Sequence, residues 1–142
     1  MKFEFSLESV LKVREHEEKV QKQKLAEKLN KKKHLNELKE RLKRELENHI
    51  SENGSSAYEN LHDLQRKQQY INDLHDKVQK VNSSLASVKK AVDQQRDKLA
   101  DVHKKRHIME KVKEGERELF LEEMTRQQRK VMDEVATQTF SK

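Results

Sequence analysis

The sequence contains no cysteine, no proline and no tryptophan, and only two glycines among its 142 residues. Without cysteine the chain can form neither a disulfide framework nor a thiolate metal site. Two glycines are too few for a glycine-rich phosphate-binding loop. Apolar residues make up 32% of the chain, below the roughly 45–50% that is typical of compact domains. The chain therefore cannot bury a large core, which leaves disorder or long helices that bury a narrow stripe.

Long apolar runs are also missing. The first residues, MKFEFSLESVLKV, alternate apolar with charged residues, unlike a secretory signal. No stretch approaches the roughly 20 apolar residues of a membrane span, so we expect a soluble cytoplasmic protein. The net charge of +6 is distributed as 14 basic and 11 acidic residues in 1–53, 10 and 7 in 57–105, and 8 of each in 106–142. This spread argues against nucleic-acid binding, which usually clusters its cations.

A seven-residue repeat in the second half of the chain separates helix from disorder. Its first positions (a) are all apolar: Ala57, Leu64, Ile71, Val78, Leu85, Val92 and Leu99. Five of its eight fourth positions (d) are apolar: Leu74, Val81, Val88, Val102 and Met109, but not Asn60, Lys67 or Gln95. Such a repeat predicts a left-handed coiled-coil helix. A looser stripe of leucines from Leu7 to Ile50 predicts a second, less tightly packed helix.

Helix-ending residues gather between these two stripes. Asn53 and Gly54 can end a helix in the left-handed conformation, and Ser56 with Glu59 forms a capping box for the next helix. Ser6 is the candidate N-cap of the first helix. A single continuous helix that tolerates Gly54 is the alternative.

We therefore expect an all-α protein: a long antiparallel two-helix coiled-coil hairpin with an overhanging C-terminal helix. It would be a single domain over residues 1–142, with helix one at about 6–52, a turn at 53–56 and helix two at about 57–138. Folding about residue 54 or 55 would place Leu7 near Val102 and Leu11 near Leu99, so that residues from about 106 to 140 overhang without a partner.

The sequence offers no catalytic or metal site. A two-helix coil has no concave interior for a Ser-His-Asp constellation. His103 and His107 share a helix face, but Lys104, Lys105 and Arg106 lie between them and would repel a metal ion. We expect both histidines to be solvated, and we expect a protein that is not an enzyme and binds no cofactor and no metal.

Three stretches follow one another along the chain: FEFSLESVLKVREHEEKVQKQKLAE, YENLHDLQRKQQYINDLHDKV and MEKVKEGERELFLEEMTRQQRKVMDEVATQTF. The first resembles the opening of the flagellar export protein FliJ family. The second is similar to that family's segment after the turn, and the third to its tail. The residues that fill the opening pattern are Phe3, Phe5, Leu7, Val10, Leu11, Val13, Arg14 and Glu18. The resemblance covers nearly the whole chain.

The resemblance implies a component of the bacterial flagellar type III protein export apparatus. Such a protein is a coiled coil similar to the stalk of rotary ATPases. It engages the hexameric export ATPase FliI and the export gate protein FlhA, and it assists export chaperones at the cytoplasmic face of the basal body. A generic coiled-coil scaffold or a needle-type secretion stalk is the alternative, and a nucleic-acid-binding coil is a third. We expect no nucleic acid partner, no membrane span, and a monomer or weak dimer.

Two sets of contact residues follow from this resemblance. The expected gate-protein contact lies on helix two near the turn: Tyr70, Leu74, Lys77 and Val81. Because Leu74 and Val81 are also d positions, core packing is an equally good interpretation of them. The expected ATPase-ring contact lies on the overhang: Val112, Arg117, Phe120, Met124, Arg126, Arg129 and Lys130. The alternative for these residues is a frayed tail or a crystal dimer contact.

Overall fold

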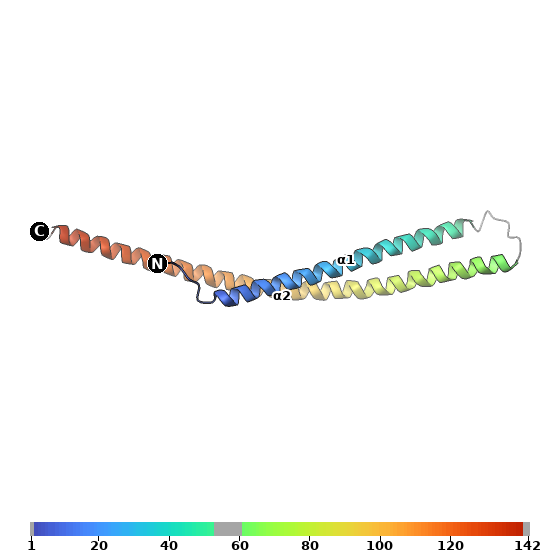
Figure 1. Ribbon diagram of the computed structural model, residues 1–142, viewed down its shortest axis with the longest axis horizontal. Coiled ribbons are helices and arrows are strands. Elements are labelled where there is room, and N and C mark those ends of the chain that lie inside the picture. Colours follow the sequence, from blue (N-terminus) through green and yellow to red (C-terminus); the bar gives the residue numbers. More distant parts are fainter. Residues whose placement is uncertain (1, 53–60, 141–142) are drawn as a thin grey trace. The chain divides into compact units, whose positions relative to one another are not determined.

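The computed structural model describes residues 2–52 and 61–140, which form two long α-helices. Helix α1 is Glu8–Glu52, and helix α2 is Leu61–Phe140 (Figure 1). No residue in the described ranges is in a β-strand. The absence of proline allows such lengths, because proline removes a backbone donor and breaks a helix interior. The expected all-α class is confirmed. The predicted turn, Asn53–Ser56 with its capping box to Glu59, lies outside the described residues.

Contacts divide the chain into two units, each of which contains part of both helices. The middle unit comprises residues 22–98, and the terminal unit comprises residues 1–21 together with 99–142. The expectation of one domain over residues 1–142 stays a prediction.

The middle unit packs α1 against α2 through an apolar seam. Leu74 and Val92 are 2% and 1% exposed, and Val78, Val81 and Val88 are also buried. All five lie at a or d positions of the predicted repeat. Each buried side chain of this size contributes about 1.5–3 kcal/mol relative to an exposed one. The contacts of α1 with α2 run antiparallel, since Lys28 meets Gln95 and Glu45 meets Tyr70.

Gln95 is a polar residue inside this seam. It occupies a d position, is 1% exposed, and accepts a hydrogen bond of 3.1 Å from the Lys28 ammonium. A polar residue at a core position lowers stability but fixes the register, because only one alignment gives it a partner.

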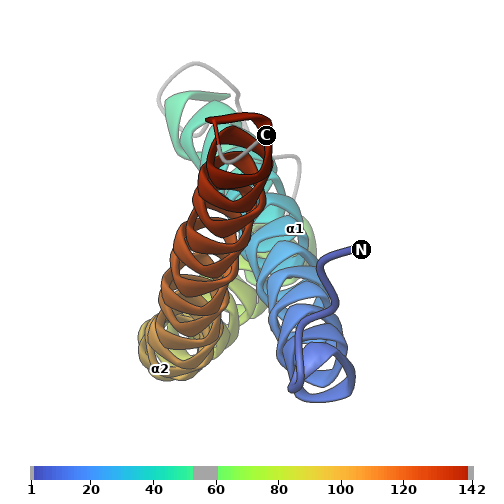
Figure 2. The same ribbon diagram turned by 90° about the vertical axis from the view of Figure 1, so that its left-hand side faces the viewer.

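The terminal unit is also antiparallel, but its helices meet through mixed chemistry. Phe5 and Leu11 are buried, and so is the carboxylate of Glu18. The Lys113 ammonium lies 3.1 Å from the Glu8 carboxylate. The residues before α1, dark blue in Figures 1 and 2, reach further along α2, where the rings of Phe3 and Phe120 are 5.5 Å apart.

The predicted register is wrong. It placed Glu8 opposite residue 101 and Lys28 opposite residue 81, whereas the structure places them against Lys113 and Gln95. In both cases the observed partner lies further along α2 than the predicted one, by 12 and by 14 residues.

In the terminal unit, the residues before α1 extend the contact with α2 still further toward the C-terminus of α2. Residues 2–5 are not helical, and an extended residue advances about 3.3 Å, compared with 1.5 Å in a helix. Ser6 was expected to cap α1. Instead, its hydroxyl donates to Glu116 at 2.7 Å, and α1 begins two residues later, at Glu8.

The overhang therefore begins later than predicted. Residues 106–120, expected to lack a partner, include Arg106, Lys113, Glu116 and Phe120, all of which contact the first 21 residues. Beyond Met124, every described residue from Thr125 to Phe140 is exposed. This last stretch of α2 is the overhang that the fold class predicted.

Candidate functional site

The expected gate contact divides into two buried and two exposed residues. Leu74 and Val81 are buried in the seam of the middle unit, in agreement with the alternative of core packing. They cannot touch another protein unless α1 and α2 separate. Tyr70 is 41% exposed and Lys77 is exposed. Only these two of the four expected residues present a side chain at the surface.

Tyr70 joins α2 to α1 within the middle unit. Its hydroxyl donates a hydrogen bond to the Glu45 carboxylate, and its ring meets the edge of the His49 ring at a centroid distance of 4.7 Å. The hydrogen bond to Glu45 raises the pKa of Tyr70, with smaller contributions from burial and from the negative charge of Glu45. Sequence reasoning missed Glu45 and His49, because the predicted register placed other residues opposite Tyr70.

A shallow groove begins at Tyr70 and follows the surface of α2. Asp73, Asp76, Lys77 and Lys80 line it together with the edge of Leu74. Charges of both signs therefore surround an exposed aromatic ring, an arrangement typical of protein-binding surfaces. Of the expected gate residues, the structure brings Tyr70 and Lys77 together in this groove.

The expected ATPase-ring contact divides along α2. Phe120 packs against Phe3, so the N-terminal residues already cover part of its ring. Val112 and Arg117 lie in the same unit, in the stretch that contacts residues 1–21, and both are exposed. Met124, Arg126, Arg129 and Lys130 belong to the last part of the helix, where α2 has no neighbour among the described residues.

This last part of α2 has two faces of different chemistry. Met124, Val131 and Met132 line a shallow apolar groove with two glutamines, Gln127 and Gln128. Because residues three and four apart are neighbours on a helix, Arg126, Arg129 and Lys130 lie on the side of α2 opposite Met124 and Val131. Carboxylates share this charged side: Glu122, Glu123, Asp133 and Glu134. Arg126 pairs with Glu123 at 3.7 Å.

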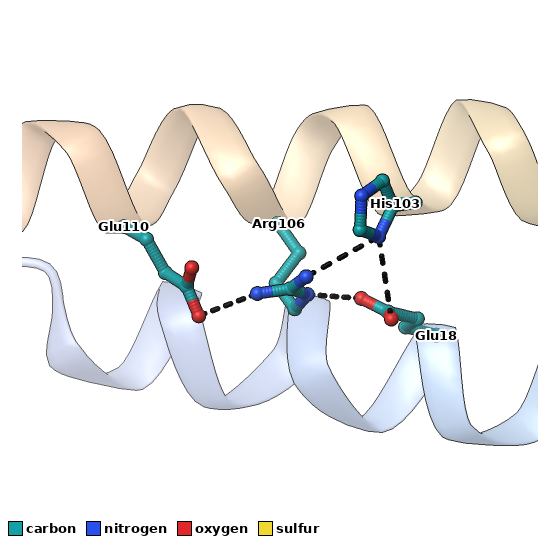
Figure 3. A network of polar contacts seen from close by, with 4 residues as sticks. All are labelled: Glu18, His103, Arg106 and Glu110. Carbon is teal, nitrogen blue, oxygen red and sulfur yellow. Dashed lines mark hydrogen bonds and ion pairs between the residues drawn. The ribbon is translucent and has the colours of Figure 1, made fainter.

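A charged network joins α1 and α2 in the terminal unit (Figure 3). Glu18 is 5% exposed and accepts a hydrogen bond from Nε of the Arg106 guanidinium. Arg106 also donates to Glu110, and its Nη2 lies 3.2 Å from Nδ1 of His103. Bonds to Glu110 and then to Glu18 raise the pKa of Arg106, which stays charged.

Sequence reasoning found neither the network nor the role of Arg106. Residues from about 106 were expected to lack a partner, whereas Arg106, at the next a position of the repeat, continues the interface because its long side chain reaches Glu18. His103 is exposed, as expected, and its Nδ1 lies 3.5 Å from the Glu18 carboxylate. A glutamate at position 18 within the loose leucine stripe was the available signal. Among the described residues, no group of histidine and carboxylate side chains could hold a metal ion.

Comparisons with known proteins agree with this geometry. The family model described as "Flagellar FliJ protein" matches residues 2–142. No curated protein and no solved structure matches the chain. Neither helix, over its described residues, contains a segment long and apolar enough to cross a membrane.

Proposed function

Because the chain belongs to the flagellar FliJ protein family, it is a component of the flagellar protein export apparatus, and we propose that it acts there as a stalk and adaptor. One end would bind the ring of the export ATPase FliI, and the other would bind the export gate protein FlhA. The protein would work at the cytoplasmic face of the basal body, without catalytic activity of its own, and would assist delivery by export chaperones.

The observation that carries this proposal is the exposed end of α2. Every residue from Thr125 to Phe140 is exposed, including Val131, Val135 and Phe140. Helices in water owe most of their stability to the packing of an apolar face, so a helix of this kind is marginal alone. A binding partner that covers the apolar face would stabilise it.

The two faces favour a partner that surrounds the helix. Met124, Val131 and Val135 lie on one side, and Arg126, Arg129 and Lys130 on the other. A helix lying on a flat surface uses one side only, whereas a helix inside the pore of a ring can use both. The ring would offer apolar side chains to the first side and acidic side chains to the three cations of the second, which also carries Glu122 and Asp133.

The proposed gate contact is supported by the groove beside Tyr70 in the middle unit. Tyr70 supplies an exposed aromatic ring and Lys77 an exposed charge, and aromatic residues are enriched in interfaces. Leu74 and Val81 are buried in the seam and are not proposed as direct contacts.

Stimulation of purified export ATPase tests the ring contact. The double variant Val131→Ser with Val135→Ser should lose most of the stimulation, because both changes make the apolar face polar. A matched control is Leu61→Ser with Ile108→Ser, which changes exposed apolar residues of α2 outside the proposed ring contact. Full stimulation by the first variant, or equal loss in both, would refute the ring contact and favour a generic coiled-coil scaffold.

Binding to the gate protein tests the second end. Tyr70→Ala should weaken binding, whereas Tyr70→Phe removes only the hydroxyl that bonds to Glu45 and should bind nearly as well as the original chain. If both variants bind the gate protein normally, Tyr70 has only a structural role, in the contact between α1 and α2. Circular dichroism checks that helix content is unchanged.

A further inference from the structure

The net charge of the protein is concentrated in one part of the middle unit. This part extends from the contact of Lys28 with Gln95 to the contact of Glu45 with Tyr70. Residues 28–45 carry 8 basic and 3 acidic side chains, and residues 70–95 carry 4 and 3. Their net charge is +6, which equals that of the whole chain, so all other residues together are neutral.

This concentration is hidden when charge is counted over long segments. Residues 28–44 alone carry 8 basic and 2 acidic side chains, whereas residues 1–27 are neutral and residues 45–53 add three acidic side chains. The excess charge therefore lies in one run of α1. Antiparallel packing in the middle unit places this run beside residues 70–95, which are close to neutral.

The basic residues of α1 gather around a shallow groove on its surface. Lys32, Lys33, Arg41 and Arg44 line it, together with Leu29, Asn36, Glu37 and Glu40. Lys33, Arg41 and Arg44 are exposed. Within the part of the chain that the structure describes, none of the four cations forms an ion pair or a side-chain hydrogen bond.

We propose that this groove on α1, lined by residues 29–44, is a docking surface for an acidic helix of a partner protein. Cations without partners, gathered on one surface, attract an acidic partner over a distance of about 8–10 Å at moderate salt. Partly exposed Leu29 adds an apolar contact, and the carbon stems of the lysine and arginine side chains extend it.

The groove fits a protein better than a nucleic acid or a membrane. Glu37 and Glu40 lie among its cations, and they would repel a uniformly negative surface. A protein can place a polar or basic residue opposite these carboxylates. The groove also contains no aromatic ring on which a base could stack.

The spacing of the cations sets the length of the partner. Lys33 and Arg44 are eleven residues apart, about 16 Å along a helix at 1.5 Å per residue. The partner therefore needs three turns of helix with carboxylates on one face, separated by three or four residues.

A labelled synthetic peptide provides the test. The peptide is a capped helix of about 18 residues, or five turns, with glutamates on one face. Its binding to the full chain is followed by fluorescence anisotropy at low and at physiological salt. The variant Lys33→Glu, Arg41→Glu, Arg44→Glu should bind at least tenfold more weakly. The control Lys12→Glu, Lys19→Glu, Lys24→Glu makes the same change in net charge at exposed positions and should change affinity less than threefold.

Three results would overturn the proposal. The first is an equal loss in both triple variants, which would mean that only net charge matters. The second is equally tight binding of a peptide with the same glutamates scattered around the helix. The third is tighter binding of vesicles containing one-third phosphatidylserine, or of a short RNA duplex. Neither triple variant changes a residue proposed to contact the ATPase ring or the gate protein. Stimulation of the ATPase by the groove variant therefore tests the proposed stalk function independently of the docking surface.

Discussion

The two units use the same heptad position for opposite chemistry. In the middle unit, a positions hold Val78 and Val92, which are buried apolar residues. In the terminal unit, the next a positions hold Arg106 and Lys113, which pair with Glu18 and Glu8 of α1. One helical repeat thus continues from an apolar seam into an ion-paired one.

The difference predicts different sensitivity to mutation and salt. Apolar burial has no direction and depends little on salt, so the middle unit should be the more stable. Ion pairs depend on geometry and are screened by salt, and exposed pairs such as Glu8 with Lys113 contribute at most about 1 kcal/mol. The terminal unit should therefore open first.

The largest effect is expected from a cavity in the apolar seam. Leu74→Ala removes a side chain that is fully buried, and such changes cost about 2–5 kcal/mol. Urea denaturation followed by circular dichroism measures the loss. Leu64→Ala is the matched control, since Leu64 is exposed at an a position. Equal losses in the two variants would mean that the seam does not hold the middle unit together.

A smaller effect is expected from the ion-paired seam. Glu18→Gln removes the charge that Arg106 and His103 contact, and a lost charged hydrogen bond costs about 1.5–3 kcal/mol. Amide hydrogen exchange of residues 8–21 should become faster. Glu17→Gln, which affects a more exposed pair with Arg14, should change exchange little. Indistinguishable exchange in the two variants would contradict the role of Glu18.

The smallest effect concerns the titration of Tyr70. Its raised pKa means that the folded state favours the neutral phenol, so the hydrogen bond to Glu45 stabilises the protein fully below pH 10.0. This contribution is lost as the pH rises through the folded-state pKa. Ultraviolet absorbance of phenolate, in a Tyr58→Phe background, should show late ionisation of Tyr70. Glu45→Gln should bring it back toward 10.0, and an unchanged titration would remove Glu45 as the cause.

The all-α fold and the seam of the middle unit could be predicted from the sequence, because burial follows a repeat that is visible in the residues themselves. The register could not, because it depends on where the first helix ends and the second begins. That error hid the contacts of Glu45 with Tyr70 and of Ser6 with Glu116. It also made the overhang appear too long.

The candidate sites were predicted in part, for a related reason. The pattern shows which residues are apolar or charged, but not whether a d residue such as Leu74 remains accessible after packing. Charge in the middle unit was hidden for another reason, since counts over long segments combined residues 28–45 with the neutral and acidic stretches on either side. The exposed face with Met124 and Val131 was found because no later packing covers it.

Hydrogen exchange of the whole chain, alone and with the assembled export ATPase ring, tests the central claim most directly. The proposed stalk predicts slower exchange in residues 121–140, where α2 has no neighbour among the described residues, and little change in residues 61–98. Slower exchange confined to the middle unit, with residues 121–140 still exchanging as in the free chain, would contradict it.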